Sequence, residues 1–510
     1  YVQEIKMQLI QEELHDVETP QTKEKLERLE SLDKVKLAAS VMEKVRPQKM
    51  ERIVGQERAV EAMRSKVASV YPQHILLYGP PGVGKTTAAR IILEEAKKLP
   101  YTPFSVDAPF VETDGTTLRW DARDMTNPLI GSVHDPIYQG ARRDLADTGI
   151  PEPKPGLVTD AHGGILFIDE IGEMDPLLLN KLLKVLEDKR VKFDSAYYDA
   201  SDPAVPAYIR KLFAEGAPAD FILIGATTRS PQEINPAIRS RCAEVYFEPL
   251  NGTDIQAIVR NAAHDLSVSL EDGVAEYISE FTVEGRKAIN LLADMYGYAV
   301  YKQGSGENTV ITLEDAKHVV RIGHFIPYAA EKASSLPVAG KVFGLGVSGY
   351  LGSVIEIEAV AFPAREAGKG YFRFNDTAGS MAKDSLFNAA AVVRAVTGKE
   401  ISDFDINVNF VGGGQIDGPS AGTAVTVALI SALTGKKVRQ DAAVTGEISV
   451  SGQVRAVGGI FEKAYGASRA GMKDMIIPAE NKDEITKHHL NLNIHAVTTI
   501  QEVMSLLFVE

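Results

Sequence analysis

Two short motifs in this chain each set a lysine beside residues that can do chemistry. The first is the glycine-rich segment 79–86. It contains three glycines and two prolines and ends in Lys85 and Thr86. Such a loop wraps backbone N–H groups around phosphates, its lysine reaches the β and γ phosphates, and its threonine hydroxyl ligates Mg²⁺. An apolar run at 75–78 precedes the loop and a helical pattern follows over 85–98, the context that this chemistry requires. The predicted nucleotide-binding residues are Gly79, Pro80, Pro81, Gly82, Val83, Gly84, Lys85 and Thr86.

Two carboxylates end a second apolar run. Residues 165–168 are followed directly by Asp169 and Glu170. Ligands of open α/β sheets gather at the carboxyl ends of the strands. Alone, this pattern is typical of an exposed turn, but beside a phosphate loop it favours a nucleotide site. We therefore predict that Asp169 completes a Mg²⁺ site with Thr86 and that Glu170 polarises the attacking water.

The second lysine motif pairs with a serine far upstream. Ser420 lies in a Gly-Pro-Ser turn before a small-residue helix, where backbone N–H groups can stabilise an oxyanion. Lys463 follows a Gly-Gly turn, at the expected start of another helix. Taken singly, the serine is typical of a helix cap and the lysine of a helix surface. A lysine near its reference pKa of about 10.4 cannot accept a proton at neutral pH, so a general-base role requires that burial lower the pKa.

A serine–histidine–aspartate triad is the competing chemistry for Ser420. The candidate bases are His488, His489 and His495, which lie in a polar C-terminal segment typical of surface histidines. Asp417, three residues before the serine, is the candidate acid, and its role is left open. Nothing in the sequence around these histidines indicates a triad.

Changes in composition and in hydrophobic pattern divide the chain into four predicted parts. Residues 1–46 form a charged helical arm. Residues 47–250 alternate β-type and helical runs, which predicts a parallel sheet with crossover helices. Residues 251–325 contain no convincing strand and form a helical lid, and 326–510 form a separate α+β domain. The apolar run 421–433 is shorter than the roughly 20 residues of a membrane-spanning helix and is predicted to be a buried core helix.

Composition limits the classes of partner. The formal net charge of −14 gives no basic footprint for nucleic acid, which is therefore not the default partner. The single cysteine, Cys242, cannot form an internal disulfide, which favours a reducing compartment.

The first half of the chain resembles the AAA+ ATPases. Beyond the phosphate loop, the resemblance rests on segments 53–56, 225–228, 235–242 and 285–288. It implies sensor 1 at Thr228, an arginine finger at Arg241 and sensor 2 at Arg286. Because an arginine finger acts on the next subunit's nucleotide, it also implies a homohexameric ring.

A ring ATPase of this kind grips its substrate with loops that face a central pore. Leu129 and Ile130 lie where such a loop is expected, between the second strand and the Asp169 strand. An ordinary loop that packs two apolar side chains is the alternative.

The second half closely resembles the proteolytic domain of the Lon proteases. The resemblance rests on the strings around Ser420 and Lys463, 43 positions apart, and on the Thr-Gly-Glu string that begins at Thr445. It implies that Ser420 is the nucleophile, that Lys463 is the general base and that Thr445 helps to orient the lysine. The implied fold is an α/β AAA+ module, with a parallel sheet and a helical lid, followed by an α+β Lon-type proteolytic domain.

The likeness to Lon covers the chain from about residue 47. The large N-terminal substrate domain of A-type Lon is missing, and segments 128–138 and 191–219 look more like B-type Lon, including the form in spore-forming bacteria. The implied function is an ATP-dependent serine endopeptidase that uses ATP and Mg²⁺ to unfold, translocate and degrade damaged or regulatory proteins. We expect it in the cytoplasm, peripheral to the inner face of the membrane only if a segment upstream of Tyr1 attaches it.

Two other functions stay open at this stage. A remodelling ATPase, including one that acts on DNA, would share the segment 225–229 but does not need a domain with a paired Ser420 and Lys463. An unfoldase with a latent peptidase domain would carry every motif, because motifs do not report the geometry of the serine or the ionisation of the lysine.

Overall fold

The computed structural model describes residues 20–33, 40–118, 128–134, 150–195, 197–203, 205–304, 306, 308–325, 327, 332–348, 351–375, 380–411, 418–485 and 492–509. The chain divides into two compact units, Tyr1–Arg46 and Pro47–Glu510.

The first unit contains the helices α2 (Pro20–Asp33) and α3 (Val41–Lys44). The predicted helical pattern is confirmed over α2, whose leucines Leu26, Leu29 and Leu32 are all exposed. Residues 1–19 and 34–39 of the predicted arm lie outside the described residues.

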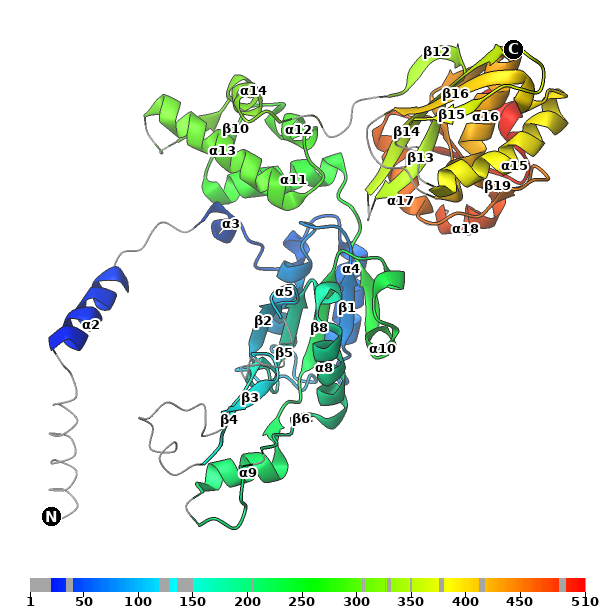
Figure 1. Cartoon of the computed structure of the whole chain (residues 1–510). Helices are drawn as coiled ribbons and strands as arrows, with labels where there is room; N and C mark the ends of the chain where they lie inside the picture. The colour runs from blue at the N-terminus through cyan, green and yellow to red at the C-terminus, as the bar shows by residue number, and fades with distance from the viewer. Residues whose placement is uncertain are drawn as a thin grey trace, which may run out of the picture. The chain divides into compact units, whose positions relative to one another are not determined.

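A parallel five-stranded sheet forms the nucleotide-binding part of the second unit (Figure 1). Its strand order is β2-β5-β8-β1-β9. The strands are β1 (Ile75–Tyr78), β2 (Phe110–Asp114), β5 (Ile165–Asp169), β8 (Ile222–Thr227) and β9 (Ala243–Tyr246). Their side chains are mostly apolar and buried, as expected where both faces of a parallel sheet are covered. The predicted parallel sheet is confirmed.

Helices and short turns precede and connect these strands. They are η1 (Met50–Arg52), α4 (Glu57–Val67), α5 (Lys85–Ala96), α7 (Leu157–Asp160), η3 (Ile171–Glu173), α8 (Pro176–Asp188), η4 (Pro231–Glu233) and α10 (Pro236–Arg239). α8 begins where its sequence dictates, because Asp175 accepts hydrogen bonds from the free N–H groups of the first turn and Pro176 needs none.

Two segments of the chain lie outside the five-stranded sheet. The first is the antiparallel pair β3 (Gly131–His134) and β4 (Glu152–Pro155). The second is β6 (Arg190–Val191), α9 (Ala207–Glu215) and β7 (Ala217–Pro218). A small core joins the two, since Ile150 packs with Val205 and Ile209.

Four helices form the lid: α11 (Gly252–Leu266), α12 (Val274–Ser279), α13 (Gly285–Gln303) and α14 (Leu313–Ile322). The prediction of a lid without strands is wrong in one detail. β10 (Ser269–Leu270) pairs in parallel with β11 (Val310–Ile311). Each of these strands has two residues, too few for a periodic pattern to reveal.

A seven-stranded mixed sheet forms the core of the C-terminal part, in the order β15-β16-β14-β13-β18-β21-β22. Its strands are β13 (Lys341–Ser348), β14 (Leu351–Pro363), β15 (Phe372–Phe374), β16 (Phe404–Val411), β18 (Ala442–Val444), β21 (Asp474–Pro478) and β22 (Asn493–Val497). Two pairs stand apart, β12 (Ser334–Ala339) with β17 (Lys437–Gln440) and β19 (Glu447–Ile448) with β20 (Val454–Arg455). The α+β prediction is confirmed.

Helices pack on both faces of this sheet. α16 (Gly422–Thr434) and α15 (Ser380–Thr397) share one apolar core with it, and α17 (Ile460–Arg469) shares another. α16 is apolar on all sides and almost wholly buried, as predicted for this segment. The remaining elements are η5 (Ile401–Asp403), η6 (Pro419–Ala421), η7 (Ala479–Asn481), α18 (Lys482–Ile485) and α19 (Ile500–Leu507).

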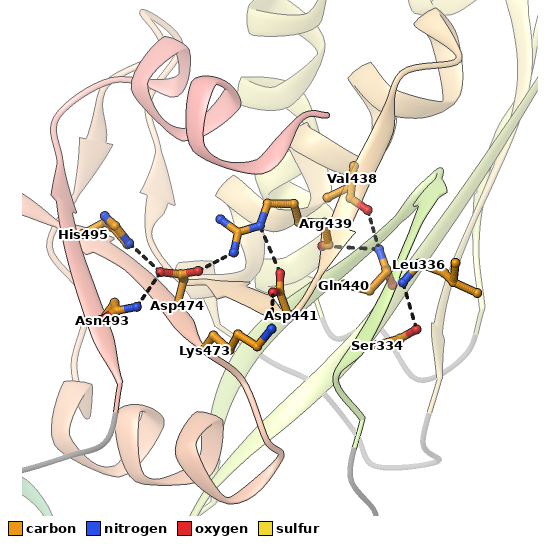
Figure 2. Close-up of polar contacts among 10 residues, drawn as sticks. All are labelled: Ser334, Leu336, Val438, Arg439, Gln440, Asp441, Lys473, Asp474, Asn493 and His495. Carbon is orange, nitrogen blue, oxygen red and sulfur yellow. Dashed lines mark hydrogen bonds and ion pairs between the residues drawn. The ribbon is translucent and has the colours of Figure 1, made fainter. Parts of the chain in front are cut away.

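A charged cluster fastens the amino ends of β18, β21 and β22 (Figure 2). Asp474 accepts hydrogen bonds from Asn493 Nδ2 at 3.2 Å and His495 Nε2 at 2.8 Å, and pairs with Arg439. Arg439 Nε also donates to Asp441 Oδ1 at 3.0 Å. The opposite, carboxyl ends of β18 and β21 lead into Thr445 and η7, so the cluster fixes strands that carry the candidate peptidase site.

Within the described part of the chain, every helix is too short or too polar to cross a lipid bilayer.

Candidate functional site

The glycine-rich loop is shaped to surround phosphates. It lies between β1 and α5, with Gly82 at φ 73° and Gly84 at φ 102°, backbone angles that glycine adopts without strain. Lys85 is buried, and its Nζ donates to the carbonyl oxygens of Gly79 at 2.6 Å and Pro80 at 2.8 Å. The lysine is thus folded back over its own loop, where phosphate oxygens can replace the two carbonyls as acceptors.

Burial lowers the pKa of Lys85 to about 8, although the carboxylates of Glu170 and Asp169 act to raise it. An amine in this environment is poorly solvated. It therefore gains more from a dense negative charge than a surface lysine would.

The predicted metal and water-polarising residues meet at the ends of β5 and β8. Thr86 Oγ1 donates to Asp169 Oδ2 at 3.4 Å. Glu170 has a φ of 45°, unusual for a residue with a side chain, and its Oε2 accepts from Thr228 N at 3.2 Å and Thr228 Oγ1 at 3.1 Å. The threonine at the predicted sensor 1 position thus holds the glutamate that is expected to polarise the attacking water.

The two predicted arginines lie in different settings. Arg286 begins α13 beside the loop, since a Cβ built on Gly82 would lie 3.5 Å from its backbone N. Arg241 lies after α10, and its Nε donates to Glu187 Oε1 of α8 at 3.1 Å while its Nη1 donates to Ala237 O at 2.9 Å. Within this chain the arginine at the predicted finger position is therefore paired with an acidic side chain.

These residues fit a nucleotide with Mg²⁺. The loop offers backbone N–H groups at the start of a 12-residue helix and a buried cation for the phosphates. The adjacent oxygens of Thr86 and Asp169 are of the hard type that Mg²⁺ prefers.

The pore-loop prediction is not supported for Leu129. Its side chain is fully buried in the core of the nucleotide-binding part, and Ile130 packs against the same core. The structure thus favours the alternative of an ordinary apolar loop. The sequence did not decide between the two, because the residues that bury Leu129 come from distant segments.

Ser420 lies in η6, immediately before α16. Gly418, two residues earlier, has a φ of 137°, so the turn depends on glycine. Ser420 O accepts from Gly446 N at 3.1 Å, which ties the turn to the segment after β18. The predicted place of the serine, in a tight turn at a helix N-terminus, is confirmed.

Lys463 lies in the first turn of α17, against β14. The helix approaches the strand so closely that a Cβ on Gly352 would lie 1.7 Å from Glu462 O and 2.9 Å from Lys463 N. The side chain is 3% exposed. Burial lowers the pKa of Lys463 to about 8, against the raising effects of Glu462 and Glu484, as the general-base hypothesis predicted.

The serine and the lysine line one cavity, together with Gly459 and Glu484. Among the described residues, no hydrogen bond joins Ser420 Oγ to Lys463 Nζ. Catalytic hydrogen bonds often form only when substrate is bound, so this geometry is compatible with the dyad.

Thr445, expected beside the lysine, contacts the serine instead. It is fully buried after β18, and its Oγ1 donates to Ser420 O at 3.4 Å. Its hydrogen-bonding partner is therefore the backbone of the nucleophile's turn.

The alternative triad gains no support. His495 is bonded to Asp474 in the charged cluster at the amino ends of the strands. Asp417, His488 and His489 lie outside the described residues.

Sequence reasoning missed the polar groups that surround the lysine. Glu484 and Asn481 belong to the segment after β21, where neither spacing nor composition marks them. It also missed Glu187, the carboxylate that pairs with Arg241. Each is found only through a contact between distant segments.

Comparisons with known proteins agree with both halves of the site. Residues 75–250 match the model of the ATPase family associated with various cellular activities (AAA), and residues 314–510 match that of the Lon protease (S16) C-terminal proteolytic domain.

Relatives resemble nearly the whole chain. Lon protease 2 of Bacillus subtilis is 43% identical over 497 residues, which cover 95% of this chain and 89% of the relative. The archaeal Lon protease of Archaeoglobus fulgidus is 28% identical over 78% of this chain and 68% of its own length. The Lon protease of Fusobacterium nucleatum is 29% identical over 86% of this chain and 55% of its own length.

Proposed function

Because this chain belongs to the Lon family of ATP-dependent serine proteases, with a B-type relative in Bacillus subtilis, we propose that Ser420 and Lys463 are its peptidase dyad. The observation that carries this proposal is that one cavity holds a serine at a helix N-terminus and a buried lysine whose pKa is about 8. Lysine at that pKa is about one-tenth neutral at pH 7, enough to act as a base.

In the proposed peptide cleavage, neutral Lys463 Nζ takes the Ser420 Oγ proton as Oγ bonds to the substrate carbonyl carbon. Backbone N–H groups at the start of α16 stabilise the oxyanion. The protonated lysine then returns the proton to the leaving amine, and water hydrolyses the acyl-enzyme with the same base.

The AAA part binds ATP. We propose that Lys85 and the loop N–H groups hold the phosphates, that Glu170 polarises the attacking water and that Thr228 orients Glu170. Thr86 and Asp169 would hold Mg²⁺, which neutralises charge on the phosphates when bound. Arg286 lies beside the same loop, as a sensor of bound nucleotide requires.

Members of this family generally form oligomeric rings that act on protein substrates. For this chain we propose a homohexamer in which Arg241 leaves Glu187 to reach the nucleotide of the next subunit. Unfolded or damaged proteins would be threaded to Ser420 in an enclosed chamber. We also propose the four-part division at residues 46, 250 and 325, and, from the single Cys242, a cytoplasmic location.

The test is degradation of an unfolded protein with ATP and Mg²⁺ by the parent chain, Ser420→Ala and Glu170→Gln. We expect Ser420→Ala to lose proteolysis but keep ATPase activity, and Glu170→Gln to lose both. A parent chain that hydrolyses ATP without cleaving would indicate an unfoldase with a latent peptidase domain instead.

A further inference from the structure

Four charged groups of the peptidase part line the cavity that holds Ser420: Lys332, Glu462, Lys463 and Glu484. Lys332 Nζ is engaged with the backbone, since it donates to Val354 O at 2.7 Å. Glu462 precedes Lys463 on α17. Glu484 comes from a different element, α18, and is the one carboxylate in this set whose position depends on tertiary structure.

Asn481, at the end of η7, holds Glu484 in place. The asparagine is 3% exposed, and its Nδ2 donates to Glu484 Oε1 at 2.8 Å. The same amide pairs with both backbone groups of Val457, accepting from its N at 3.0 Å and donating to its O at 3.1 Å. Val457 directly precedes the turn of Gly458 and Gly459 that opens α17. One buried amide therefore fixes both Glu484 and the chain that delivers Lys463.

We propose that Asn481 and Glu484 are positioning residues for Lys463, with the Glu484 carboxylate stabilising the ammonium that forms during catalysis. The inference rests on the proposed dyad. When the proton moves from Ser420 Oγ to Lys463 Nζ, a positive charge appears in a site that is poor in water. A carboxylate in the same cavity offsets that charge, and the fixed amide keeps the carboxylate in place before the reaction begins.

The charges around the lysine support this assignment. Burial is the largest influence on the pKa of Lys463 and lowers it, while Glu462 and Glu484 both raise it. Of the two carboxylates, Glu462 has the larger effect, and it is fixed to Lys463 by being the preceding residue on α17, whereas the effect of Glu484 depends on the hydrogen bond that holds it. Glu484 lies at the exposed rim and accepts the Asn481 hydrogen bond.

The experiment is the pH profile of kcat/KM for a small fluorogenic peptide, from pH 6 to 10, with the full chain and ATP and Mg²⁺ present. Without the carboxylate, Lys463 loses its proton more easily and is a weaker base. We therefore expect Glu484→Gln to move the midpoint of the rising limb down by roughly half a pH unit and to lower the plateau about threefold. Glu484→Asp keeps the charge and should return the midpoint toward that of the parent.

Glu480→Gln is the matched control. Glu480 lies in the same segment and also bears one negative charge, but it accepts from Arg455 Nη1 and Ala456 N, does not line the cavity and is not among the groups that shift the pKa of Lys463. We expect its midpoint to equal that of the parent. A Glu484→Gln profile that is lowered equally at every pH, with its midpoint unmoved, would overturn the positioning role. If Lys463→Met keeps its activity, the dyad itself fails, which is a distinguishable result.

Discussion

In the proposed mechanism, the nucleotide site and the peptidase site use the same side chain in opposite ionisation states. Each has one lysine in the first turn of a helix, each amine is buried, and in each the pKa falls to about 8. Lys85 must be charged to hold phosphates, whereas Lys463 must be neutral to accept a proton. The pKa alone therefore does not reveal what a buried lysine does.

Their hydrogen bonds distinguish the two lysines. Lys85 Nζ donates to two backbone carbonyl oxygens, an arrangement that favours the ammonium form. For Lys463, no such acceptor is found among the described residues, and its carboxylate neighbours act through space. The two acceptors therefore suit the proposed role of Lys85 as a cation, and the absence of such acceptors among the described residues suits the proposed role of Lys463 as a base.

The largest expected effect comes from replacing each lysine by methionine, which has similar length and no charge. Lys463→Met should reduce peptide cleavage by about 10³-fold or more while ATPase activity stays within about threefold of the parent. Lys85→Met should reduce ATP hydrolysis by at least about 10²-fold and leave cleavage of small peptides largely intact. Steady-state assays of both activities on both variants measure this.

Thermal unfolding serves as the control for these variants. Burying an amine costs solvation, so neither variant should unfold at a lower temperature than the parent. If Lys463→Met loses both activities together with its stability, the contrast between the two lysines is not established.

Local patterns predicted the strands, turns and helices that carry the site. The apolar run 75–78 became β1, and the segment rich in small apolar residues became the buried helix α16. The phosphate loop and the turn at Ser420 were predictable because glycine, proline and a following helix are adjacent in sequence.

Contacts between distant segments were not predictable in the same way. For Leu129 the sequence left a pore loop and an ordinary packed loop open, and a core assembled from several strands and helices buries it. Glu484 reaches the cavity because Asn481 meets Val457 across the fold. The close approach of α17 to Gly352, which buries Lys463, is likewise set by packing. A single sequence indicates which residues can react but not which polar groups will surround them.

The next largest expected effect is that peptide cleavage and nucleotide binding change in opposite directions with pH. The neutral form of Lys463 increases with pH, so kcat/KM for a small peptide should rise about tenfold from pH 7 to pH 9, with a midpoint near 8. The charged form of Lys85 decreases over the same range, so the dissociation constant of a nucleotide should also rise about tenfold, meaning weaker binding. Peptide kinetics and nucleotide titrations at each pH measure the two trends.

ATP-dependent degradation of a protein needs neutral Lys463 and charged Lys85 together. Its rate should therefore be maximal near the pH at which the two trends cross, about pH 8. If nucleotide affinity does not change between pH 7 and pH 9, the two backbone acceptors hold Lys85 in its charged form more strongly than its burial opposes it. The contrast between the two sites would then be sharper than the pKa values indicate.

The smallest expected effect is at Thr445, where the sequence suggested contact with the lysine and the structure shows contact with the serine's backbone. Thr445→Val removes a hydroxyl whose bond to Ser420 O is long, and Gly446 N remains as a donor to the same oxygen. We expect kcat/KM for a small peptide to fall only a few-fold, about 1 kcal/mol or less, with the midpoint of the pH profile unchanged. Thr445→Ser keeps the hydroxyl and should restore most of the loss. A midpoint that moves in Thr445→Val but not in Thr445→Ser would mean that the hydroxyl turns to Lys463 when substrate binds, and that the peptidase lysine acquires a direct partner during turnover, as Lys85 already has at rest.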